Sequence, residues 1–350
     1  MRAIDDLLRE ANEAGASDVH VTTGRPPFFR VDGALQSIGT EPITDEEIKQ
    51  IVSTVMADNE NALSDLNQFK QADFSYALQN GPRFRVNVFY HVGQPSVALR
   101  LIPTKIRTVE ELHLPPQVLY FCDLKQGFVL CVGPAGHGKS TSLAALIDYI
   151  NENRQEHIIT IEDPVEYLFV DKKSIIDQRE VGHDTASFAT AIRATLRQDP
   201  NVIMIGEIRD LESMQTALTV AETGHLVFAT MHTNDASQTI ERIIDSFPPN
   251  QQRQVRAQLA SALSGVISQR LLPWTAGGRI PAMELMIATT AIRNVIREGN
   301  VHQIPGIIQT SSDVGMQTLD ASLQALVDAG AVGMQDARPY FTMSKNLTSR

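Results

Sequence analysis

Hydrophobic and polar positions in the first third of the chain predict a mixed unit of helices and strands. Apolar residues within 4–11 repeat at i, i+3, i+4 and i+7, which predicts a first helix with one buried stripe. Residues 19–21 and 28–31 are short apolar runs typical of strands, and Asp32-Gly33 has the composition of a tight hairpin turn. Residues 44–47 read Thr-Asp-Glu-Glu, a capping box at the start of a second helix.

A long stretch of alternating residues follows. From 83 to 91 apolar and polar positions alternate, the pattern of a half-buried strand, so Arg83 and Arg85 are predicted to project from the same face. Residues 97–101 alternate in the same way, with Arg100 between apolar neighbours. The chain then becomes rich in proline and loses its periodicity, which predicts a domain boundary at 103–116.

The second half alternates apolar strands with helical patterns. Strand-like runs lie at 128–132, 158–161, 202–205 and 226–229, which predicts a mostly parallel sheet with helices on both faces. Beyond about residue 271, a Gly277-Gly278 hairpin and helical segments near 291–298 and 316–329 predict an all-helical tail. The predicted division is an N-terminal α+β domain at 1–102, a linker at 103–116, an α/β core at 117–270 and a C-terminal hairpin and helical region at 271–350.

Composition and charge exclude several classes of protein. Thirty Lys and Arg against 41 Asp and Glu give a net charge of −11, which disfavours a nucleic-acid partner. Two cysteines, Cys122 and Cys131, cannot build a disulfide framework or a four-cysteine zinc site, so we expect reduced thiols in a cytoplasmic protein. No secretory signal and no apolar run of about 18 residues is present, so direct membrane insertion is not expected.

A glycine-rich segment between a strand and a helix fits the phosphate-loop pattern. Backbone N–H groups of such a loop surround an anion at a helix start. Lys139 is expected to reach the β- and γ-phosphates of ATP, and Ser140 to ligate Mg²⁺. The predicted nucleotide-binding residues are Gly133, Pro134, Ala135, Gly136, His137, Gly138, Lys139, Ser140 and Thr141.

Acidic residues follow two of the predicted strands. Glu207 ends the run 202–205 after a glycine and is our candidate for orienting the attacking water. Gly206 stands where phosphate-loop ATPases usually carry a metal-binding Asp. Residues 160–166 supply Glu162, Asp163 and Glu166, and the first two are candidates for the missing metal or water contact.

Histidines and arginines complete the candidate site. His232 follows the run 226–229, where a group that senses the γ-phosphate is expected, and His225 precedes it. Arg193 and Arg197 are four residues apart in a helical segment, so they are predicted to share one face.

These motifs together resemble a known family, the secretion and pilus motor ATPases of type II secretion and type IV pili. Residues 133–141 are similar to its Walker A motif, 160–166 to its Asp box, 203–210 to an atypical Walker B motif and 224–233 to its His box. The resemblance implies a PAS-like N-terminal domain, a RecA-like ATPase domain and a homohexameric ring with ATP between domains. It further implies that Arg83, Arg85 and Arg100 act on the nucleotide phosphates together with Arg193 and Arg197.

Within the family, the chain is most similar to the retraction ATPases of twitching motility. It has neither the additional N-terminal region nor the four-cysteine zinc element of the assembly ATPases. Residues 291–298 are similar to the retraction motors' C-terminal motif, in which Arg293 and Arg297 are expected to couple hydrolysis to a partner or to ring motion. His137 departs from the usual Ser or Thr, and Val295 from the usual Leu.

The sequence therefore predicts a cytoplasmic, hexameric, Mg²⁺-dependent ATPase that drives pilus retraction at the cytoplasmic face of the inner membrane. Its expected partners are an inner-membrane pilus platform protein and a second retraction ATPase. Four alternatives remain open: a regulatory ring subunit with little turnover, a type II secretion or pilus assembly ATPase, a nucleic-acid translocase and a GTPase.

Overall fold

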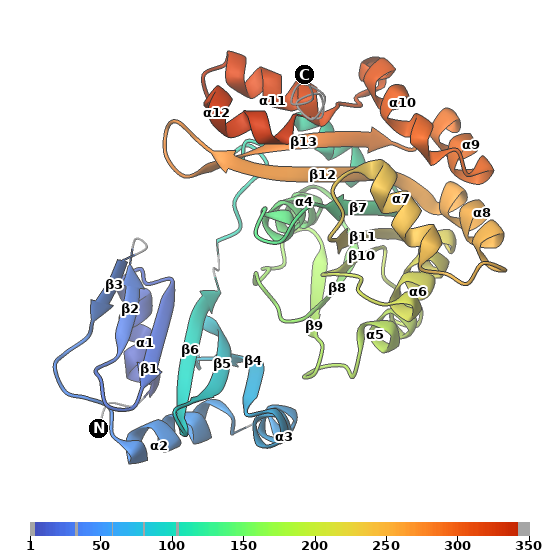
Figure 1. Cartoon of the computed structure of the whole chain (residues 1–350). Coiled ribbons are helices and arrows are strands. Elements are labelled where there is room, and N and C mark those ends of the chain that lie inside the picture. Colours follow the sequence, from blue (N-terminus) through green and yellow to red (C-terminus); the bar gives the residue numbers. More distant parts are fainter. Residues whose placement is uncertain (1–3, 32–33, 58, 80, 103–104, 342–350) are drawn as a thin grey trace. The chain divides into compact units, whose positions relative to one another are not determined.

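A computed structural model describes residues 4–31, 34–57, 59–79, 81–102 and 105–341, and it divides into two compact units. The first unit contains the chain up to residue 105 together with 163–168 and 180–186, and the second contains 106–162, 169–179 and the chain from 187 onward (Figure 1). The division between residues 105 and 106 lies inside the predicted linker. Two short segments beyond this division, 163–168 and 180–186, nevertheless belong with the first unit, and the periodicity of the sequence did not indicate this.

The first unit is a six-stranded antiparallel sheet with helices. The strand order is β3-β2-β1-β6-β5-β4. The strands are β1 (Asp18–Thr22), β2 (Phe28–Val31), β3 (Ala34–Ser37), β4 (Gln71–Ala77), β5 (Arg83–His91) and β6 (Gln94–Ile102). The helices are α1 (Ile4–Glu13), α2 (Asp45–Val55) and α3 (Glu60–Phe69).

Local sequence patterns account for these elements. The apolar stripe of α1 is buried, and Thr44 and Glu47 form the predicted capping box of α2. Along β5, Phe84, Val86 and Val88 are buried while the intervening side chains are less so, as the alternation predicts, but Tyr90 further along the same face is exposed. The predicted turn at Asp32-Gly33 lies outside the described residues.

The second unit is built on a seven-stranded sheet of order β13-β12-β7-β11-β10-β8-β9 (Figure 1). The strands from β12 to β8 in this order are parallel, and β13 is antiparallel to β12. Its strands are β7 (Gly127–Val132), β8 (His157–Glu162), β9 (Ile175–Glu180), β10 (Val202–Ile205), β11 (Leu226–Met231), β12 (Leu263–Pro273) and β13 (Arg279–Ile287).

Helices cover both faces of this sheet, as predicted. Phe228 packs on one face of the sheet, in the same cluster as the apolar residues of α4. Phe128 and Ile203 point to the opposite face of the sheet and are also fully buried. The helices are α4 (Lys139–Asn153), α5 (Phe188–Thr195), α6 (Leu211–Glu222), α7 (Ala236–Asp245), α8 (Gln252–Ala262), α9 (Thr290–Glu298), α10 (Ile304–Thr310), α11 (Leu319–Asp328) and α12 (Met334–Ala337). Four 3₁₀ segments are η1 (Pro116–Cys122), η2 (Val301–Gln303), η3 (Ser312–Val314) and η4 (Arg338–Tyr340).

The predicted hairpin at Gly277-Gly278 and the two predicted helical segments are present, but the tail beyond residue 271 is not all helical. β12 and β13 form a long hairpin, with Gly277 and Gly278 in its connection, and β12 pairs with β7 inside the main sheet. α11 packs against β13, so this strand is covered and most of its residues are buried (Figure 1). A strand covered in this way has a nearly continuous apolar run, which periodicity does not distinguish from a buried helix.

The stretch 106–116 is likewise part of a core. Val109, Leu112 and Leu114 are buried in the same cluster as the apolar face of α4. The connection between the units is therefore much shorter than the predicted linker, because its second part is anchored on the second unit.

Candidate nucleotide site

The loop between β7 and α4 has a backbone that depends on glycine. Gly133, Gly136 and Gly138 have φ angles of 148°, 75° and 78°. A Cβ atom at Gly133 would lie 2.5 Å from the carbonyl oxygen of Gln269, so a side chain there is excluded. Gly138 is the N-cap of the 15-residue helix α4 and provides no side-chain cap, so the first N–H groups of this helix are available to an anion.

Lys139 lies at the centre of this loop. Its side chain is buried, and its ammonium donates to the carbonyl oxygens of Gly133 and Pro134, both at 2.9 Å. The hydroxyl of Ser140 makes no hydrogen bond within the described part of the chain. A nucleotide phosphate requires hydrogen-bond donors, and the buried ammonium and the uncapped helix amides provide them. A divalent cation bound to that phosphate requires oxygen ligands, and the hydroxyl of Ser140 can be one of them.

Glu207 and His232 lie at the carboxyl ends of the neighbouring strands β10 and β11. Lys139 Nζ is 3.4 Å from His232 Nδ1, and His232 Nε2 is 3.4 Å from a carboxylate oxygen of Glu207. The three side chains therefore form a continuous row from the loop to β10. Arg209, which sequence reasoning missed, forms an ion pair with Glu207.

Glu162 occupies the carboxyl end of β8, beside β10. It is 5% exposed and accepts hydrogen bonds from Thr160 Oγ1 at 2.6 Å and Gln178 Nε2 at 3.1 Å. A Cβ atom at Gly206 would lie 3.3 Å from the carbonyl oxygen of Ile161. Strand β8 therefore leaves little room for a side chain at residue 206, where an Asp is usual. It places the carboxylate of Glu162 at the same edge of the sheet as Glu207.

Strand β12 holds the phosphate loop through residues that sequence reasoning missed. Gln269 accepts from Ser142 Oγ at 2.7 Å and donates to the carbonyl of His137 at 2.8 Å. The next residue, Arg270, donates to the carbonyl and side-chain oxygens of Asn234 in the loop after β11, both at 3.0 Å. In the sequence, these residues could have been noticed only as two polar residues, Gln269 and Arg270, inside the apolar run of β12.

Three candidates of the second unit lie apart from this row. His225 precedes β11, so it lies at the opposite edge of the sheet from His232, and its Nδ1 is 3.1 Å from the carbonyl of Val220 near the end of α6. Arg193 is exposed on α5 and pairs with Glu212 at 2.8 Å. α5 ends at Thr195, so Arg197 lies in a turn beyond it and the predicted common helical face is wrong.

Three arginine candidates and two acids belong to the first unit. Arg83 donates to Glu180 at 2.9 Å and to Ser75, and Arg100 donates to Asp18 at 2.9 Å. Arg85 is directly opposite Arg100 in the sheet and has no ion pair among the described residues. Asp163 and Glu166 lie in the segment 163–168, whose Val165 N–H donates to Glu180 at 3.2 Å.

The C-terminal motif forms α9, where the two arginines differ. Arg293 Nη1 donates to the carbonyls of Ala260 and Ser261 at 2.7 and 2.6 Å, at the end of α8, and burial lowers its pKa. Arg297 is exposed and donates to Asn294 at 2.9 Å. Arg293 therefore caps the end of α8, and the expected role of both arginines in coupling stays a prediction.

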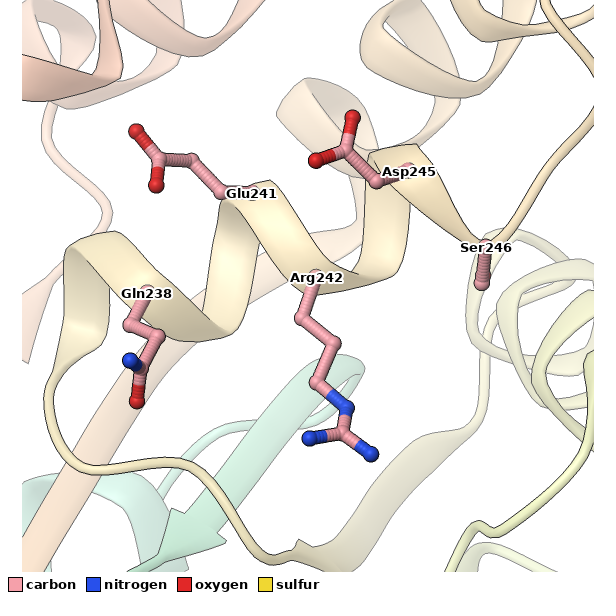
Figure 2. A pocket seen from close by; sticks show the side chains of 5 residues that line it. All are labelled: Gln238, Glu241, Arg242, Asp245 and Ser246. Carbon is pink, nitrogen blue, oxygen red and sulfur yellow. The ribbon is translucent and has the colours of Figure 1, made fainter.

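A surface pocket lies along α7. Its lining residues are Gln238, Glu241, Arg242, Asp245 and Ser246, and none of them is a candidate site residue named above (Figure 2). Within the described ranges no group of three His, Cys, Asp or Glu side chains could hold a metal ion, and no helix is long and apolar enough to cross a membrane. Burial raises the pKa of both cysteine thiols to about 12, and neither forms a disulfide.

A glycine-rich loop between a central parallel strand and a helix, with a carboxylate at the end of a nearby strand, defines a phosphate-loop nucleotide hydrolase. The model of the family "Type II/IV secretion system protein" matches residues 1–277, and the chain belongs to this family. The resemblance seen in the motifs is therefore confirmed, as is an α/β fold with an N-terminal domain before the nucleotide-binding domain.

Curated relatives and a solved structure match nearly the whole chain. The type IV pilus retraction ATPase PilT of Pseudomonas aeruginosa is 43% identical over 98% of this chain and 99% of its own. A twitching motility protein of Neisseria gonorrhoeae is 45% identical over 92% of this chain and 86% of its own. The crystal structure of the pilus retraction motor PilT with bound ADP superposes with a TM-score of 0.90 at 46% identity, and all of both chains is covered.

Proposed function

We propose that this protein is an ATP-hydrolysing motor that powers type IV pilus retraction in twitching motility. The observation that carries the proposal is the row of Lys139, His232 and Glu207 beside the phosphate loop. A relative that matches 98% of this chain is named a type IV pilus retraction ATPase, and a pilus retraction motor solved with ADP matches the whole chain.

The residues of the second unit divide the work of binding and hydrolysis. When ATP enters, Lys139 exchanges the two loop carbonyls for β- and γ-phosphate oxygens, while the loop amides hold the remaining oxygens. Glu207 orients the attacking water, and His232 lies between it and Lys139 to report on the γ-phosphate. Ser140, with Glu162 as a further acid, would hold Mg²⁺, which neutralises charge on the phosphates when bound.

The arginines act on the phosphates in a ring of six copies. Arg83, Arg85 and Arg100 of the first unit, with Arg193 and Arg197 of the second, are the proposed set. Arg83 and Arg100 must then leave Glu180 and Asp18, so hydrolysis is linked to a change of the first unit's ion pairs. The ring works at the cytoplasmic face of the inner membrane on a platform protein, with a second retraction ATPase as a further partner.

One experiment tests the activity and the assembly together. The purified chain is assayed for phosphate release with MgATP, and its native mass is measured with and without MgATP. We expect steady turnover and the mass of a hexamer. Turnover near zero with intact nucleotide binding would favour the regulatory ring subunit instead.

A second experiment tests the direction of movement. The gene is deleted in a piliated host and twitching is scored together with surface pili. Retraction predicts more surface pili and no twitching, whereas an assembly ATPase predicts no pili at all.

A further inference from the structure

His137 lies in the phosphate loop, and the structure gives its ring a specific partner. The backbone N–H of Leu271 on β12 donates to His137 Nδ1 at 3.0 Å. β7 ends at Val132, whose partner on β12 is Ser268, so Leu271 extends beyond the paired region and has no strand on that side. The imidazole takes the place of the missing strand carbonyl.

The same loop is held by two more contacts from the β12–β13 hairpin. Gln269 Nε2 donates to the carbonyl of His137 at 2.8 Å, and Arg279 Nη1 donates to the carbonyl of Gly136 at 3.0 Å. Among these contacts, only the one from Leu271 uses the side chain of His137. A change at this side chain therefore removes this hydrogen bond and the ring contact with Tyr340, and it leaves the other two hydrogen bonds in place.

The chemical state of the ring follows from its surroundings. Because Nδ1 accepts a hydrogen bond, the neutral ring carries its proton on Nε2. Burial lowers the pKa of His137, and the nearby cations Arg270, Lys139 and Arg279 lower it further. The ring centroid of Tyr340 lies 6.5 Å from that of His137. The acceptor is therefore retained at neutral pH.

We propose that His137 is a positioning residue that holds the phosphate loop against β12 through the hydrogen bond it accepts from Leu271, and that nucleotide affinity depends on this bond. The inference rests on the proposed nucleotide site and adds a contact made by this chain's own loop residue. A loop held open in advance loses less conformational freedom when phosphate binds, so its affinity is higher.

The test compares three substitutions of the full chain. ADP affinity is measured directly, and KM and kcat for ATP are measured in parallel. In His137→Ala we expect ADP affinity to fall about fivefold to tenfold, the effect of one net hydrogen bond, with KM rising in step and kcat changing less than twofold. His137→Asn places an oxygen near the position of Nδ1 and recovers most of the affinity. His137→Gln places its oxygen near Nε2 and does not.

A pH series separates positioning from general loop damage. Protonation removes the acceptor, so the parent loses more ADP affinity than His137→Asn as the pH falls through the lowered pKa of His137. His302→Ala, at an exposed histidine of the same unit, is the matched control and keeps the parent's profile.

Two results would overturn the inference. One is parent-like ADP affinity in His137→Ala, and the other is equal affinity of the Asn and Gln variants. If the parent itself binds ADP but does not hydrolyse ATP, the proposed motor function fails while the affinity comparison still decides the role of His137.

Discussion

Glu207, just beyond the end of β10, has two side-chain neighbours. Arg209 forms an ion pair with its carboxylate, and the ring of His232 lies on the other side. The carboxylate of Glu207 is the group we assign to the attacking water. In Glu207→Gln the amide keeps the volume but cannot accept a proton, so we expect turnover to fall by at least about 100-fold, within the range for loss of a general base. ADP binding should stay within about threefold of the parent.

Phosphate release and ADP titration on the same preparation check this prediction. Glu241→Gln, at an exposed carboxylate of α7, is the matched control. Parent-like turnover in Glu207→Gln would assign the catalytic carboxylate to another residue, with Glu162 the nearest alternative at this edge of the sheet.

Glu284 on β13 is a half-buried acid whose ionisation opposes folding. It accepts from the N–H of Ala236 at the start of α7 at 2.9 Å. Burial raises its pKa from 4.5 to about 7, with Asp235 and Asp320 adding to the rise. A raised carboxyl pKa favours folding at low pH, and this contribution is lost as the pH rises from about 4.5 to about 7.

The substitution Glu284→Gln keeps an acceptor for Ala236 and removes the charge. We expect it to raise the melting temperature at pH 8 by several degrees, with about 3 kcal/mol as the upper limit, and to have little effect at pH 5. Thermal melts at the two pH values measure the difference, with Asp313→Asn as an exposed control. Equal effects at both pH values would contradict the ionisation argument.

At the scale of elements, the hairpin between β5 and β6 contains a strained residue. Val92 and Gly93 form a two-residue turn with φ angles of 50° and 79°. Both central residues of such a turn need positive φ, which costs a β-branched residue about 1–2 kcal/mol. Val92 is 88% exposed and therefore gains little from packing.

Replacing Val92 by Asn should stabilise the first unit by about 1 kcal/mol. Hydrogen exchange of the β5 and β6 amides, measured in the full chain, reports the change locally. Val92→Thr keeps the β-branch and should give no gain, so a gain of equal size in both variants would exclude backbone strain as the cause.

Helix α9 carries one arginine that contacts α8, Arg293, and one exposed arginine, Arg297. Arg293→Ala leaves the last carbonyls of α8 without their donor, so we expect a loss of about 1–3 kcal/mol in stability. Arg297→Ala should change stability by less than about 0.5 kcal/mol, because Arg297 is an exposed surface residue. Arg297→Ala alone therefore tests coupling to retraction, by thermal melts together with twitching of cells that carry it.

On the scale of the whole molecule, the two units need one another for hydrolysis if the arginines of the first unit act on ATP. A fragment of residues 106–350 keeps Val109, Leu112 and Leu114 in its core, which a fragment starting at 117 would lose. We expect the longer fragment to bind ADP and to hydrolyse ATP at least about 1,000-fold more slowly than the full chain, as when an arginine finger is removed. Full activity of a fragment that binds ADP would exclude Arg83, Arg85 and Arg100 from catalysis.

Much of the site could be predicted because its chemistry is local. The phosphate loop lies between a strand and a helix that are adjacent in sequence, and its glycines are required by the turn they make. Glu207 and His232 each follow an apolar run, and parallel strands bring their carboxyl ends to one edge of a sheet. The helix starts, the capping box of α2 and the alternation in β5 depend only on residues a few positions apart.

Contacts between distant segments were decided by the tertiary structure alone. β12 pairs with β7 across more than 100 residues, and only this pairing brings Gln269 and Leu271 beside the loop that contains His137. The attachment of 163–168 and 180–186 to the first unit and the capping of α8 by Arg293 have the same origin. Periodicity and turn chemistry report a residue's immediate neighbours, whereas these contacts depend on which strands pair and which backbone groups that pairing leaves without a partner.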